Sequence, residues 1–167
     1  WAAIGRVPMY RIVLYALAVL VGASFVASAA GWLYYSPAEL ATLLGVVLII
    51  TLGVSRLAAR IWRAESHDES SLITALLLFF ILKPGLETGD LTAAAVGATA
   101  AALSKFVIAW RGRHLLNPAA FGAFVVTVTG IGASYWWIGS SVLVWAVVPV
   151  AAVVRPASVR VAPSTIP

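Results

Sequence analysis

The sequence contains no cysteine and only one methionine among its 167 residues. The missing thiols exclude disulfide bonds, thiolate zinc sites and cysteine-ligated iron–sulfur clusters within this chain. Charged residues are scarce as well: Asp, Glu, Lys and Arg make up 10% of the chain, against about 25% in a typical soluble domain. A soluble fold of this length could not hide the apolar surface that remains.

Apolar residues take the place of the missing charges. They make up 62% of the chain, and the mean hydropathy is +1.01. Lipid must solvate such a surface, so we expect an all-α integral membrane protein of the cell (inner) membrane. The net charge of +5 does not indicate a nucleic-acid partner, because the basic residues lie between apolar runs, as in membrane topology signals.

Six apolar stretches predict about six transmembrane segments. They run from about Ile12 to Leu33, Leu40 to Leu57, Ser70 to Leu82, Leu91 to Trp110, Asn117 to Thr129 and Tyr135 to Val154. We expect residues 1–155 to form one polytopic membrane domain. Residues 156–167 then form a C-terminal tail or linker on the cytoplasmic side.

The basic residues predict the orientation of these segments. If alternate loops lie on opposite sides, one side receives every basic residue except Lys83: Arg6, Arg11, Arg56, Arg60, Arg63, Lys105, Arg111, Arg113, Arg155 and Arg160. The positive-inside rule makes that side cytoplasmic, so both termini are expected there. Tyr34, Tyr35 and the run Tyr135-Trp136-Trp137 then fall where an outer aromatic belt would lie.

Segments three and five are shorter than the roughly 20 residues that a span needs. Ser66-His67-Asp68-Glu69 has the spacing of a capping box before the third segment,. Asn117-Pro118 places an N-cap residue and a proline at the start of the fifth,. Short helices in membrane bundles often direct their positive N-terminal ends at a buried ligand, which makes both segments candidate half-spanning helices. The alternative is that they are thin or tilted spans.

Two stretches of the sequence resemble one known family. Residues 69–84 resemble its third helix, and residues 104–122 carry its most specific mark, Ser104-Lys105-Phe106 followed by Asn117-Pro118-Ala119 and Gly122. The family contains the B subunit of sodium-translocating NADH:quinone reductase and the D subunit of the Rnf electron-transport complex. The arginine- and alanine-rich style is similar to actinobacterial members, and the chain covers about one half of the family fold.

The resemblance implies a membrane electron-transport subunit that holds a flavin, riboflavin or FMN. The family's covalent FMN site is a Ser-Gly-Ala-Thr motif in an external loop. The nearest string here, Val96-Gly97-Ala98-Thr99, lacks the serine and falls inside an apolar stretch, so we expect any flavin to be noncovalent. The resemblance also implies a cytoplasmic flavin/NAD(P)H reductase module or partner subunits, as in a flavin-dependent NAD(P)H oxidoreductase. A homo-oligomer is another expected arrangement.

Five residues are candidates for the flavin site. Helix N-termini and an amide can stabilise the negative charge of a reduced flavin, and hydroxyls can bond a ribityl chain. The candidates are Asn117, His114, Ser70, Ser71 and Thr74. Each has a plainer role: Asn117 as an ordinary N-cap, His114 as a headgroup-region residue, and the hydroxyls as bonds within their own helix.

Other functions remain open at the level of sequence. No Asp or Glu lies within an apolar stretch, which disfavours a proton-coupled carrier. The two histidines, His67 and His114, are expected at the membrane surface, so neither haem ligation nor another metal site is predicted. The alternatives to a flavin subunit are a small-solute channel or transporter of urea-channel-like architecture, and a structural membrane subunit.

Overall fold

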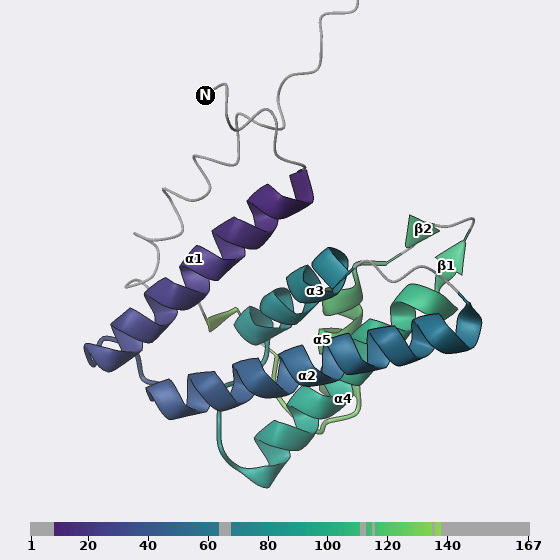
Figure 1. Cartoon of the computed structure of the whole chain (residues 1–167). Helices are drawn as coiled ribbons and strands as arrows, with labels where there is room; N and C mark the ends of the chain where they lie inside the picture. Colours follow the sequence, from purple (N-terminus) through teal and green to yellow (C-terminus); the bar gives the residue numbers. More distant parts are fainter. Residues whose placement is uncertain (1–8, 64–67, 111–112, 115, 135, 138–167) are drawn as a thin grey trace, which may run out of the picture.

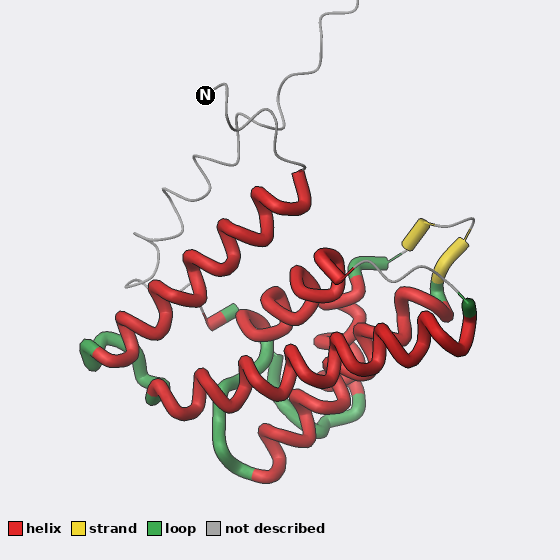
Figure 2. The backbone as a smooth tube through the Cα atoms, in the orientation of Figure 1, coloured by secondary structure: helices red, strands yellow, loops and turns green. Residues whose placement is uncertain are grey.

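The computed structural model describes residues 9–63, 68–110, 113–114, 116–134 and 136–137. It contains the helices α1 (Met9–Ala29), α2 (Pro37–Trp62), α3 (Asp68–Ile81), α4 (Thr88–Val107) and α5 (Pro118–Val128) (Figure 1). Between α4 and α5, strand β1 (Ala109–Trp110) pairs antiparallel with β2 (Arg113–His114) (Figure 2). Apart from this two-residue pair, the predicted all-α class is confirmed over the described residues.

The start and end of α2 follow from local sequence signals. Ser36 is its N-cap: the Oγ atom accepts from the backbone N–H of Glu39, and the Glu39 carboxylate accepts from the backbone N–H of Ser36 at 2.7 Å. This reciprocal capping box, with Pro37 at the first helical position, fixes where the helix begins. The helix continues past the predicted end at Leu57 and stops at Arg63, which adopts a left-handed conformation with φ 50°.

The fourth and sixth of the predicted segments are not reproduced as expected in the described residues. The fourth was expected to extend to Trp110, and this boundary is wrong: α4 ends at Val107, and Ala109 and Trp110 enter the β pair. Val107, Ile108 and Trp110 are β-branched or aromatic and favour extended backbone over helix,. Almost all of the sixth predicted segment, from Tyr135 to Val154, lies outside the described residues.

Contacts between helix ends show that consecutive helices alternate in direction. Arg11 near the start of α1 forms an ion pair with Glu69 at the start of α3. Trp62 at the end of α2 stacks on Phe106 near the end of α4, with ring centroids 6.0 Å apart. One end of the cluster therefore holds the starts of α1 and α3 with the ends of α2 and α4, as Figure 1 also shows.

Within the described part of the chain, two helices are long and apolar enough to cross a membrane: α1 from Tyr10 to Ala29, and α2. Their outward faces keep large apolar side chains exposed, among them Val19, Val26, Ile49 and Ile61. Contiguous apolar exposure of this kind suits lipid better than water. At 1.5 Å rise per residue, the 14 residues of α3 and the 11 of α5 measure about 21 and about 16 Å,. Both are thus shorter than a hydrocarbon core of about 30 Å, as predicted.

Helices α4 and α5 approach each other through glycine. A Cβ atom added to Gly122 of α5 would collide with the carbonyl oxygen of Gly97 in α4 and lie 3.0 Å from the Cβ of Ala101. Gly97, in turn, faces Val126 of α5. Small residues at such a crossing allow close backbone packing, which is the main source of helix association in lipid.

The Gly122 contact leads to a stability prediction. Gly122→Ala should lower the free energy of unfolding by about 1–3 kcal/mol, because the added methyl group has no space against the Gly97 backbone. Gly53→Ala in α2 is the matched control, since a Cβ there meets nothing within 4 Å, and it should change stability by less than about 1 kcal/mol. Equilibrium unfolding in mixed detergent micelles measures both. Equal effects of the two substitutions would contradict the packing role.

Candidate functional site: a buried lysine at the start of α3

Lys105 lies on the buried face of α4 and is 7% exposed. Its ammonium reaches the first turn of α3, where the Nζ atom donates to the carbonyl oxygen of Ser70 at 3.1 Å. The hydroxyl oxygens of Ser70 and Ser71 both lie 3.4 Å from the same nitrogen. Because Cβ atoms tilt toward the N-terminus of their own helix, the side chain points back along α4 into the bundle.

Sequence reasoning found the hydroxyls of this site but used Lys105 as a topology signal and as part of the family mark, and not as a site residue. The available signal was the position of Lys105 near the end of an apolar stretch, within the Ser104-Lys105-Phe106 run. A cation at that depth needs polar partners, because an unpaired buried charge is very costly. The serines of α3 are those partners, and the site therefore joins two helices.

The five predicted site residues are not all brought together. Ser71 and Thr74 are buried on α3 and Ser70 is partly buried. Thr74 Oγ1 donates to the carbonyl oxygen of Ser70 at 2.9 Å, which is the plainer role considered for the hydroxyls. Asn117 is exposed at the start of α5. The His114 backbone lies in β2 and pairs with Ala109, while its side chain falls outside the described residues.

Asn117 is confirmed as the N-cap of α5. Its Oδ1 atom accepts from the backbone N–H of Ala119 at 3.0 Å, and Pro118 occupies the first helical position. The predicted capping box at Ser66-His67-Asp68-Glu69 falls partly outside the described residues. The described pair, Asp68 and Glu69, opens α3, where negative charge suits the positive end of the helix dipole.

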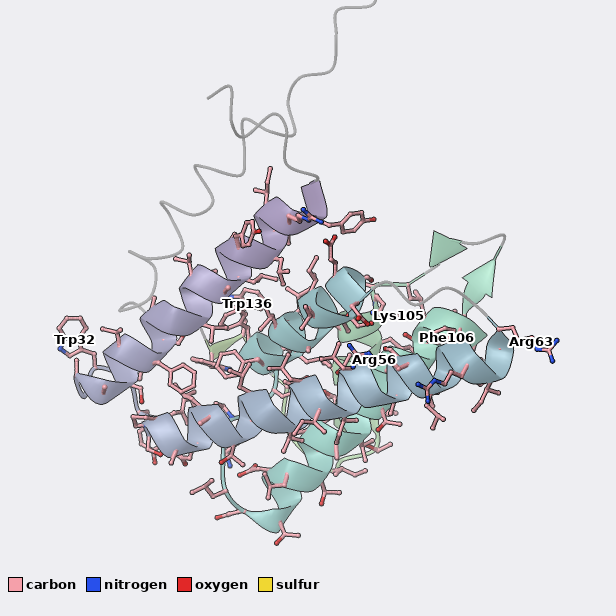
Figure 3. All side chains as sticks on the ribbon, viewed as in Figure 1. Trp32, Arg56, Arg63, Lys105, Phe106 and Trp136 are labelled. Carbon is pink, nitrogen blue, oxygen red and sulfur yellow. The ribbon has the colours of Figure 1, made fainter. Side chains whose placement is uncertain are left out.

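Two arginines from other helices hold these carboxylates. Arg56 of α2 donates to both oxygens of Asp68, at 2.9 Å from Nη2 and 3.4 Å from Nε. Its hydrogen bond lowers the pKa of the Asp68 carboxyl. Arg11 of α1 donates to Glu69 at 2.9 Å. The two ion pairs thereby connect α1 and α2 to the start of α3, at the same end of the bundle as the buried lysine. Figure 3 shows Arg56, Lys105, Phe106 and Arg63 toward this end of the cluster, with Trp32 at the other.

The neighbouring face of α2 carries two further buried hydroxyls. Thr51 is 0% and Ser55 1% exposed. Neither Thr51 Oγ1 nor Ser55 Oγ has a hydrogen-bond partner among the described residues. Buried polar atoms are normally bonded, so these hydroxyls have unused hydrogen-bonding capacity. In the same part of the chain, no three histidine or acidic side chains gather as metal ligands.

At the opposite end, one residue of the predicted aromatic belt is buried. Tyr34 is exposed, as belt residues are, and Trp136 is half-exposed. Trp137 is 5% exposed instead, and its Nε1 atom donates to the carbonyl oxygen of Phe79 at 2.9 Å. That carbonyl lies in the last turn of α3, where the helix leaves its oxygens without partners. Trp137 thus belongs to the core and caps α3.

Comparison of the chain with protein-family models, with curated proteins and with solved structures gives no match. The site is therefore interpreted from its own chemistry. It combines the buried cation of Lys105, the hydroxyls of Ser70 and Ser71, and the positive end of α3,. Such a set can bind an anionic or strongly polar group, and no carboxylate of the described residues contacts the lysine,.

The cap geometry predicts how Asn117 substitutions act on stability. Asn117→Ala should lower the free energy of unfolding by about 1 kcal/mol, because the N–H of Ala119 loses its acceptor. Asn117→Asp should stay close to the original stability, since Asp caps a helix about as well as Asn. Thermal unfolding in detergent compares the three proteins. A similar loss in both variants would show that the amide group, and not the cap, supports α5.

Proposed function

We propose that this chain is a membrane electron-transport subunit that holds a noncovalent flavin, riboflavin or FMN, near the starts of α3 and α5. The observation that carries the proposal is the buried polar set formed by Lys105, Ser70 and Ser71. A bundle in lipid has little reason to bury a lysine that no described carboxylate pairs with, unless it binds a ligand. The family resemblance in residues 69–84 and 104–122 supports flavin as that ligand.

The residues present suit a flavin by their chemistry. Hydroxyls of Ser70 and Ser71 can bond its polar side chain, and the Lys105 ammonium can balance negative charge that develops on reduction. Thr51 and Ser55 offer hydroxyls that have no other described partner. A bound flavin would supply one- and two-electron transfer. The protein's part is to hold it, exclude water and set its potential through the buried cation.

The position of Thr99 supports a noncovalent attachment. This residue lies in the middle of α4, and its Oγ1 atom donates to the carbonyl oxygen of Ala95 at 2.8 Å. A threonine bonded within its own helix is a poor site for a phosphoester to the cofactor. Electrons would reach the flavin from a cytoplasmic flavin/NAD(P)H reductase module or partner subunit, because the proposed site lies at the basic end of the bundle.

The absorption spectrum of the purified protein tests the proposal. We expect flavin bands that move wholly to the supernatant after acid precipitation. Asn117→Asp should keep its stability but lose flavin or lower its potential, because it adds negative charge beside a ligand that becomes anionic. A flavin-free protein that conducts a small solute in liposomes would instead favour the channel alternative. A fluorescent flavin band on a denaturing gel would contradict noncovalent binding.

We also propose that both termini and the Lys105 end of the bundle face the cytoplasm, with about six segments in the membrane. The exposed positions Ala38 and Gly89 lie at the far end, and exposed Val107 lies near Lys105. Single cysteines at Ala38 and Gly89 should therefore react with an impermeant thiol reagent in intact cells. A cysteine at Val107 should react only after lysis, and the reverse pattern would refute this topology.

A further inference from the structure

The outward face of α2 changes from apolar to basic toward its last turn. Between Glu39 and Arg56 the helix carries no charged residue, and Ile49 on this stretch is 73% exposed. Arg60 and Arg63 follow, and both are exposed. At 1.5 Å rise per residue they lie about 32 and about 36 Å along the helix axis from Glu39. That distance exceeds a hydrocarbon core of about 30 Å and falls within the about 40–45 Å that includes the lipid headgroups.

Neither Arg60 nor Arg63 has an ionic partner among the described residues. The acidic residues described near this end, Asp68 and Glu69, already bind arginines of α2 and α1. Glu65 lies outside the described residues, and a pair with it would still leave one of the two arginines unbalanced. Figure 3 shows Arg63 at the end of α2 with its side chain directed away from the other helices. The end of α2 therefore presents unbalanced positive charge to its surroundings.

Arg63 adopts a backbone conformation that favours glycine. With φ 50°, it is the one non-glycine residue in the described part of the chain that has a left-handed backbone. Its N–H donates to the carbonyl oxygen of Ala59 and so closes the last turn of α2. Helices commonly end in this way at glycine, because a Cβ atom is strained there. A glycine would suit the helix end better, which indicates that the arginine side chain serves another purpose.

Trp62 gives the same end a fixed aromatic surface. Its indole stacks on Phe106 of α4, with ring centroids 6.0 Å apart and an interplanar angle of 22°. The Trp62 side chain nevertheless remains half-exposed. Because the stack holds the ends of α2 and α4 together, it also fixes the backbone that carries the two arginines. Tryptophan suits the membrane interface, since its ring is apolar and its N–H requires a polar partner.

We propose that Arg60, Trp62 and Arg63 form a binding site for the headgroup of an anionic phospholipid. Guanidinium groups bind phosphate oxygens through paired, charge-assisted hydrogen bonds, and the exposed part of the indole contacts the glycerol region. Charge complementarity selects the lipid: an anionic headgroup balances the positive charge, whereas a choline headgroup brings a cation of its own. The inference rests on the membrane location proposed above and is independent of the flavin.

Binding of short-chain phosphatidylglycerol and phosphatidylcholine to the detergent-purified full chain tests this site. The readouts are the dissociation constant and the shift in melting temperature. The variants are Arg60→Gln and Arg63→Gly, singly and together. Arg56→Gln is the matched control, because it removes the same charge from the same helix, but from a residue that Asp68 already pairs. Flotation with liposomes shows separately whether each protein enters a membrane.

We expect the native chain to bind phosphatidylglycerol about tenfold more tightly than phosphatidylcholine, as two charge-assisted contacts predict. Arg60→Gln should weaken this preference, and the double variant should lose it. Arg63→Gly should weaken it too, while its melting temperature without lipid stays equal or rises, because glycine adopts the left-handed backbone without strain. That combination separates lipid binding from a structural role. Arg56→Gln should keep most of the preference.

A native chain that enters liposomes but shows no preference for phosphatidylglycerol would overturn the site and leave the membrane location standing. Equal losses in Arg60→Gln and Arg56→Gln would show a diffuse attraction and also overturn it. Binding of a polyglutamate peptide without a lipid preference would assign the surface to an acidic protein partner instead. A chain that does not enter liposomes would remove the membrane location itself, and the site with it.

Discussion

The free N–H and C=O groups at the ends of a packed helix need partners, and in the two short helices other parts of the protein supply them. At the start of α5 the Asn117 side chain accepts from the Ala119 N–H. At the end of α3 the Trp137 indole donates to the Phe79 carbonyl. The carboxylates of Asp68 and Glu69 complement the dipole at the start of α3,. This requirement explains why residues from distant parts of the sequence meet at helix ends.

Capping by Trp137 also fixes the position of α3 along its own axis, relative to α2 and α4. The indole packs edge-to-face on Phe79 and on Tyr35, with ring centroids 5.3 and 5.8 Å away. It thereby connects the end of α3 to the loop before α2. With that end held, the start of α3 lies at a fixed level against α2 and α4. The position of Ser70 and Ser71 beside Lys105 therefore depends on contacts at the opposite end of the helix.

The sequence was sufficient to predict features that arise from local chemistry. Apolar runs gave the approximate positions of the five described helices, and Asn117-Pro118 gave the start of α5. Features that depend on three-dimensional packing could not be predicted from the sequence. The burial of Trp137 and the partnership of Lys105 with α3 join residues 58 and 35 positions apart. The β pair after α4 was missed because its strands have only two residues each.

The same limit applies to the candidate site. Ser70, Ser71 and Thr74 were found because they are polar residues at the start of a short helix. Lys105 was assigned to the cytoplasmic charge count, because a lysine near a helix end normally extends to the interface. Here the side chain points inward, since α4 is held close to α5 by Gly97 and Gly122 and its buried face is covered by α2 and α3.

The charges at this end of the bundle do not contribute equally. Arg11 pairs with Glu69 and Arg56 with Asp68, whereas Lys105 has no carboxylate partner among the described residues. Both arginine pairs are about half-exposed, so solvent and salt screen them strongly. Lys105 is shielded from water, and its field is much less screened. The electrostatic character of the site is therefore set by the one buried cation rather than by the more numerous arginines around it.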